Sequence, residues 1–132
     1  MDISSIATII ISVLSSSIFT LLLSSIILEP LKEKFIFDEK KRVYESIIIF
    51  AQIVLYPKEA KYSLGVARYN IQELSDEENI SNALNDLKMA IPKLKLITKN
   101  QKIIEEIEKF IQNKDELTFN TLVNFLQKDL YK

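Results

Sequence analysis

The stretch that decides the fold is residues 3–28, ISSIATIIISVLSSSIFTLLLSSIIL, because its 26 residues include no charged side chain. The chain has 132 residues, with 18 acids and 17 bases, and every charged residue except Asp2 follows this stretch. As a helix, the stretch would be about 39 Å long, whereas the hydrocarbon core of a bilayer is about 30 Å thick. The pattern therefore predicts a transmembrane anchor over residues 1–29.

Two other interpretations of the uncharged stretch are weaker. A secretory signal peptide begins with basic residues and ends at a small-residue cleavage site. This chain begins Met1-Asp2, and no such cleavage site follows the apolar run. The second interpretation is a buried helix of a soluble domain, but a helix this long and apolar all round exceeds what a small domain can bury.

Basic residues on one side of the anchor predict its orientation. None precedes the anchor, and because cytoplasmic flanks carry an excess of lysine and arginine, we expect the N-terminus outside and the remaining chain in the cytoplasm, at the inner cell membrane. A bend or break at Pro30 would open a juxtamembrane linker over residues 30–38, either bound to lipid or simply solvated. The candidates for binding lipid headgroups are Lys32, Lys34, Lys40, Lys41 and Arg42.

A row of small hydroxyl residues runs along the predicted anchor. Residues four apart lie near one another on a helix, and small residues at this spacing let two membrane helices approach closely. We expect this row to pack against a second copy or another membrane helix. Back-bonding to the helix's own carbonyl groups is the simpler alternative, and a hydroxyl-lined pore is a third. The row consists of Thr8, Ser12, Ser16, Thr20 and Ser24.

After the linker, apolar residues recur at helical spacing and predict an all-α fold. Residues 47–56 are apolar nearly all round, which is typical of a central core helix. Short loops favour a compact antiparallel bundle of four or five helices over residues 39–132. Polar residues that can cap a helix predict where four of the helices begin: Asp38, Ser75, Thr98 or Asn100, and Asp115. Pro57 is expected to begin a further helix that reaches about Leu74. Pro92 is expected to mark a helix end or a kink.

The helix predicted after Pro57 has two uncharged faces. The second face contains Tyr62, Gly65, Val66 and Tyr69. Tyrosine is enriched at interfaces, and a glycine between two tyrosines permits close approach of another backbone. These four residues form a candidate partner face, although coverage by neighbouring helices of the bundle is the simpler expectation.

The composition excludes several kinds of catalytic site. Because there is no cysteine or histidine and only one glycine, a thiolate nucleophile, a zinc finger, an imidazole base and a glycine-rich phosphate loop are all excluded. Glu105, Glu106 and Glu108 lie opposite the apolar residues of their predicted helix, and we expect them to be solvated. We therefore expect a protein that is not an enzyme and requires no metal or other cofactor.

Charge also bears on the partners. The net charge of −1 makes nucleic acid an unexpected target. Between Asp86 and Glu105, however, the sequence has five lysines and no acid. A solvated, lysine-rich segment is the simpler interpretation, and lipid headgroups are the leading functional one. These lysines are Lys88, Lys93, Lys95, Lys99 and Lys102.

Three short stretches carry a resemblance: residues 41–45 (KRVYE), 94–98 (LKLIT) and 125–130 (FLQKDL). On these stretches the chain resembles a broad group of small, uncharacterised prokaryotic proteins with an N-terminal anchor and a helical cytoplasmic domain. The last stretch is similar to an Arg-x-Asp-Leu-Gly tail in that group, although Gln127 and Tyr131 depart from it. The resemblance implies a tethered helical fold and no particular activity.

These patterns predict a non-enzymatic, single-pass membrane protein whose anchor oligomerises and whose helical domain binds a partner or a signal. A specific version is a membrane effector in antiviral defence, in which assembly through the hydroxyl row disturbs the membrane. The alternative is a constitutive adaptor that tethers a soluble complex to the inner leaflet. The expected partners are the membrane and either further copies of the chain or another membrane or cytoplasmic protein.

Overall fold

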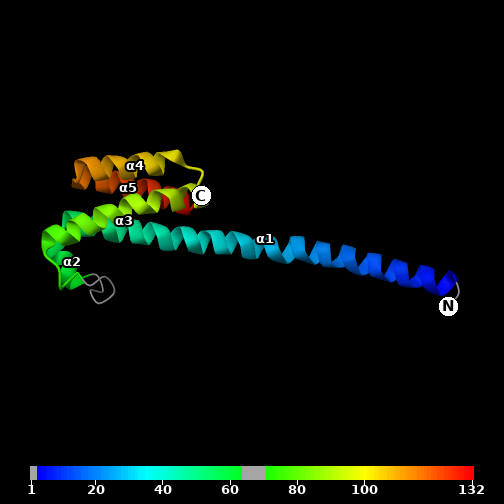
Figure 1. The fold of residues 1–132 in the computed structure, drawn as a ribbon. Coiled ribbons are helices and arrows are strands. Elements are labelled where there is room, and N and C mark those ends of the chain that lie inside the picture. The colour runs from blue at the N-terminus through cyan, green and yellow to red at the C-terminus, as the bar shows by residue number, and fades with distance from the viewer. Residues whose placement is uncertain (1–2, 64–70) are drawn as a thin grey trace. The chain divides into compact units, whose positions relative to one another are not determined.

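In the computed structural model of the chain, all regular structure within the described residues is helical (Figure 1). The backbone is described for residues 3–63 and 71–132, and the side chains for residues 28–63 and 71–132. The helices are α1 (Ile3–Leu55), α2 (Pro57–Ser63), α3 (Asp76–Ile97), α4 (Gln101–Asn113) and α5 (Glu116–Leu130). The all-α prediction is therefore confirmed.

The chain divides into two compact units, Met1–Phe37 and Asp38–Lys132. Among the residues whose side chains are described, no helix has the length and apolar character needed to cross a membrane. The anchor side chains predicted over residues 3–27, including the hydroxyl row, lie outside those residues. The anchor consequently remains a prediction.

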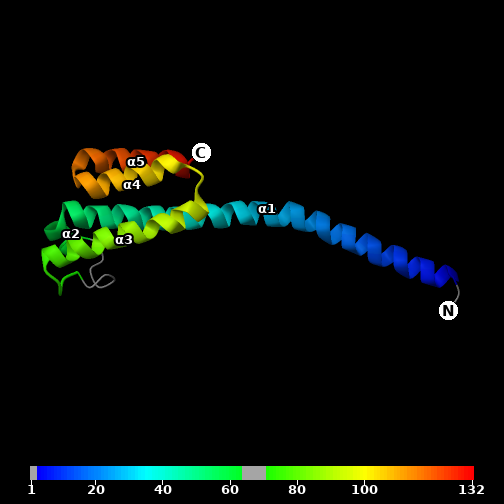
Figure 2. The ribbon, with the colours of Figure 1, turned by 45° about the horizontal axis from the view of Figure 1, so that its top comes forward.

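The second unit is a bundle of antiparallel helices, as the spacing of apolar residues predicts. Figures 1 and 2 show α3, α4 and α5 alongside the part of α1 that follows Asp38, with the chain reversing direction at each connection. Helix α4 packs against both α3 and α5. The short α2 packs against α3.

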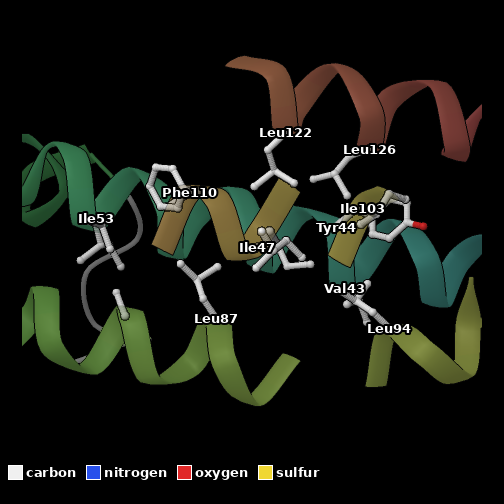
Figure 3. Close-up of a cluster of buried hydrophobic side chains, with 14 of the residues drawn as sticks. Val43, Tyr44, Ile47, Ile53, Leu87, Leu94, Ile103, Phe110, Leu122 and Leu126 are labelled. Carbon is white, nitrogen blue, oxygen red and sulfur yellow. The ribbon is translucent and has the colours of Figure 1, made fainter. Parts of the chain in front are cut away.

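One apolar core holds this bundle together. Figure 3 shows side chains from α1, α3, α4 and α5 pointing toward one another. Burying one large aliphatic or aromatic side chain is worth about 1.5–3 kcal/mol, so this core supplies most of the favourable folding energy of the unit. The largest fully buried apolar side chains are Ile47, Leu87, Leu94, Ile103, Ile107, Phe110, Leu122 and Leu126.

Three predicted N-caps are confirmed by their hydrogen bonds. Ser75 Oγ accepts from the Glu78 N–H at 3.1 Å, and Asn100 Oδ1 accepts from the Lys102 N–H at 3.1 Å. Asp115 Oδ1 accepts from the Thr118 N–H at 2.9 Å. Each cap satisfies a backbone donor that has no partner inside its helix, and so fixes where α3, α4 and α5 begin. Pro57 is the first residue of α2, also as predicted.

The predicted break at Pro30 and the predicted helix end at Pro92 are wrong, whereas the alternatives, a bend at Pro30 and a kink at Pro92, stay predictions. Pro30 lies inside α1, so residues 30–38 are helical and Asp38 does not begin a helix. Pro92 likewise lies inside α3, which continues to Ile97. A proline inside a helix removes one backbone donor and crowds the carbonyl group four residues earlier, at a cost of about 3 kcal/mol that the rest of a long helix can offset. Good helix formers follow Pro30, and the fully buried Leu94 holds the last turns of α3 in the core.

The helix predicted to reach about Leu74 is shorter in the described residues. Helix α2 ends at Ser63, and residues 71–74 form a turn. Asn79 Nδ2 donates to the Ile71 carbonyl at 2.8 Å, which holds this turn against α3. The ion pair between Lys61 Nζ and Asp76 Oδ1, at 2.9 Å, joins α2 to the start of α3.

Candidate functional site

A buried carboxylate near the end of α5 brings three distant parts of the chain together. Asp129 is 5% exposed, and its Oδ2 accepts from the Tyr44 hydroxyl at 2.5 Å. It also accepts from Thr98 Oγ1 at 3.2 Å. Lys40 Nζ lies 3.4 Å from the same oxygen. Tyr44 and Lys40 come from α1, Thr98 is the C-cap of α3, and Asp129 is in α5.

The electrostatics of this group follow from burial and from its hydrogen bonds. Burial alone would raise the pKa of Asp129, but the bond from Tyr44 and the charge of Lys40 outweigh it and hold that pKa below its ordinary value. Burial, together with the bond to Asp129, raises the pKa of Tyr44 well above its ordinary value. Tyr44 is therefore a proton donor, and Asp129 a charged acceptor, at neutral pH.

This arrangement fixes helices in place. Both Tyr44 and Asp129 are almost completely buried, and the Tyr44 hydroxyl donates to Asp129, which Thr98 and Lys40 also contact. A satisfied buried carboxylate specifies one packing of the helices that meet at it. We call Lys40, Tyr44, Thr98 and Asp129 the carboxylate cluster. It joins the beginning of the α1 segment in the bundle to the end of α5.

The carboxylate cluster is the part of the site that sequence reasoning missed. Tyr44, Thr98 and Asp129 each belong to one of the three stretches quoted for the resemblance, but nothing local marks them as neighbours. Asp129 lies 85 residues from Tyr44 and 31 from Thr98. The one available signal was the occurrence of these polar residues inside otherwise apolar helical patterns.

A second buried polar side chain, that of Asn79, belongs to α3. Asn79 is 2% exposed, and its Oδ1 has no hydrogen-bond partner within the described part of the chain. Asn79 borders a hollow of about 270 Å³, also lined by Phe50, Ile53 and Asp86. Burial raises the pKa of Asp86 above its ordinary value. A buried water commonly satisfies such an acceptor, so no ligand is needed to explain this hollow.

The predicted lipid-binding residues differ in their surroundings. Lys32, Lys34 and Lys41 are exposed. Lys40 is instead part of the carboxylate cluster. Arg42 is exposed but pairs with Glu39 at 2.8 Å within α1. Within the described side chains, three bases of this set are therefore exposed without an ion pair, and two are already engaged.

The other candidate residues are only partly described. Tyr62, in α2, is 84% exposed. Gly65, Val66 and Tyr69 of the partner face lie outside the described residues, as do the side chains of the hydroxyl row. Both groups stay predictions.

One expected solvated acid is in fact buried. Glu106 is 7% exposed, whereas Glu105 and Glu108 are exposed as expected. Lys109 Nζ pairs with Glu106 Oε1 at 3.2 Å, and this charge keeps the acid satisfied beside the core. The prediction failed because Glu106 lies next to Ile107 and one turn after Ile103, and both isoleucines are buried in the core.

Comparisons with known proteins add no function. No protein family, curated protein or solved structure matched this chain.

Proposed function

We propose that this chain is a non-enzymatic, membrane-tethered helical module. Residues 3–28 serve as the anchor, with the N-terminus outside, and the bundle binds a protein partner or a signal at the inner face. The observation that carries the proposal is that α1 includes both the uncharged run and the first core helix of the bundle.

Exposed apolar residues support the membrane part of this proposal. Leu28 and Leu31 are each 55% exposed, and Phe35 is 66% exposed. These positions share one side of α1, where the uncharged run ends at Leu28 and the next seven residues begin the charged part of the chain. Apolar side chains mixed with lysines suit the headgroup layer of a bilayer.

Extraction of membranes with alkaline carbonate tests the anchor. The full chain is expected to stay in the membrane pellet, and a reporter fused to its C-terminus should be active in the cytoplasm. Release into the carbonate supernatant would refute the anchor, and activity of a periplasmic reporter would refute the orientation.

The oligomeric state distinguishes the two versions of the proposal. An assembling effector is supported if the chain is a homo-oligomer in mild detergent and dissociates when Ser12, Ser16 and Thr20 become leucine. It is supported further if overexpression of the natural chain depolarises cells and overexpression of this variant leaves the membrane potential unchanged. A stoichiometric second protein that is lost when Tyr62 and Tyr69 become glutamate supports an adaptor. A monomer without a partner would refute both versions.

A further inference from the structure

Helix α3 exposes two large apolar side chains on the side opposite the core. Met89 is 77% exposed and Leu96 is 86% exposed. Leu87 and Leu94, on the other side of the helix, are completely buried, so the orientation of α3 is fixed. Met89 and Leu96 are seven residues apart and therefore lie two turns apart on one side of the helix. The exposed Pro92 lies between them.

Lysines flank these apolar residues on both sides. At 100° per residue, Lys88 and Lys95 fall on one flank of the line through Met89 and Leu96, and Lys93 falls on the other. All three are exposed, and none forms an ion pair with any described side chain. We call Lys88, Met89, Pro92, Lys93, Lys95 and Leu96 the α3 outer face.

The end of this face lies near the start of the bundle. Thr98, the C-cap of α3, and Lys40, the residue after Glu39, both contact Asp129 Oδ2, at 3.2 Å and 3.4 Å, which places the end of α3 close to Glu39. Glu39 follows Leu28, the end of the uncharged run, by only eleven residues. That length of chain spans about 16 Å as a helix and about 38 Å when fully extended. An inserted anchor therefore keeps the α3 outer face close to the bilayer surface.

We propose that the α3 outer face binds the anionic surface of the membrane, with Met89 and Leu96 entering the headgroup layer. This proposal rests on the proposed anchor. Apolar residues flanked by lysines are typical of helices that lie in the interface, and anionic lipid supplies the matching charge. An acidic protein surface would also match the lysines, but the short tether favours the lipid surface that the anchor brings within reach.

Single-cysteine labelling tests this proposal, because the natural chain has no cysteine. Met89→Cys and Leu96→Cys, each carrying an environment-sensitive fluorophore, report on the face. Asn124→Cys, at an exposed position of α5, is the matched control. The full chain is reconstituted in vesicles of phosphatidylcholine alone or of phosphatidylcholine with phosphatidylglycerol. In the mixed vesicles we expect blue-shifted emission and protection from acrylamide at positions 89 and 96, and neither change at position 124.

Removing the lysines should reverse this result. Each lysine near an anionic surface contributes about a five-fold preference for it, so changing Lys88, Lys93 and Lys95 to glutamine should weaken the bound state about a hundred-fold. Circular dichroism should be unchanged, since all three side chains are exposed. Labels that stay accessible to acrylamide in mixed vesicles, or equal protection in both kinds of vesicle, would overturn the proposal, and an acidic protein would then be the better partner.

The experiments distinguish a failure of the proposed anchor from a failure of the proposed membrane binding by the α3 outer face. If carbonate extracts the chain but the labels at positions 89 and 96 still shift in mixed vesicles and return in high salt, the anchor is refuted and the face is supported. If the chain resists carbonate but both labels remain in water, the face alone is refuted.

Discussion

Two parts of α1 both carry large apolar side chains, but these side chains have opposite surroundings. Within residues 28–37, Leu28 and Leu31 are each 55% exposed and Phe35 is 66% exposed. Within residues 43–54, Val43 is 5% exposed and Ile47 is completely buried. The second part is covered by α3, α4 and α5, which meet it in one core (Figure 3).

The difference teaches that the helix itself does not decide what covers its apolar residues. Leaving a leucine or phenylalanine in water rather than burying it costs about 1.5–3 kcal/mol. For residues 43–54 the bundle removes that cost. For residues 28–37 a bilayer or a second protein would have to remove it, and this is why the exposed part is the more informative about function.

The largest expected effect is on the buried part of α1. Ile47→Ala should lower the free energy of unfolding of the bundle by about 2–5 kcal/mol, because it leaves a cavity in the core. Phe35→Ala, the matched change in the exposed part, should alter it by less than about 0.5 kcal/mol. Urea unfolding of the full chain in mild detergent, followed by circular dichroism, measures both. Equal losses of stability in the two variants would contradict the difference between the buried and the exposed part of α1.

An intermediate effect is expected at the carboxylate cluster. Asp129→Asn should cost about 1–3 kcal/mol, because bonds to a charged acceptor become bonds to a neutral one. Since folding lowers the pKa of Asp129, its contribution to stability is complete above the unfolded pKa near 4 and is lost as the pH falls through the folded value.

Urea midpoints measured from neutral pH down to about pH 3 check this linkage. The natural chain should lose more stability on acidification than the Asp129→Asn variant. Asp115 also has a lowered pKa, caused by its bonds from Thr118, so Asp115→Asn serves as the control for an exposed cap. Parallel pH curves for the natural chain and the Asp129→Asn variant would show that the carboxylate charge is not involved.

The smallest effect on the bundle is expected at Pro30. Pro30→Ala restores one backbone donor and replaces a poor helix former, which favours the local helix by up to about 3 kcal/mol. Hydrogen exchange of the amides around position 30 should slow. The urea midpoint of the bundle should not change, because Pro30 lies in the first unit. A raised midpoint would mean that residues 28–37 contribute to the stability of the bundle.

Helix boundaries were predicted well where the signal is local. Ser75, Asn100 and Asp115 each bond to a backbone N–H two or three residues ahead, so a short stretch of sequence contains both partners. The break at Pro30 and the helix end at Pro92 are wrong because the free-energy cost of one proline is offset by the favourable interactions of the whole helix around it. For Pro92, the burial of Leu94 helps to offset the cost of the proline.

The carboxylate cluster lay beyond prediction for a different reason. Asp129 follows Lys128 near the end of an amphipathic helix, where an acid is usually solvated. Its burial depends on the positions of α1 and of Thr98, the C-cap of α3, and those positions follow from the packing of the whole bundle. The same is true of Glu106, which is 7% exposed although its helix carries acids on its solvated side.

The bond between Tyr44 and Asp129 has a consequence for synthesis of the chain. The two residues are 85 positions apart. At about 5–20 residues per second, a ribosome needs roughly 4–17 s to pass from the first to the second. Until α5 is complete, the apolar side chains of residues 43–54 lack part of the cover that α3, α4 and α5 provide together, so a chaperone has time to bind α1 before the bundle closes.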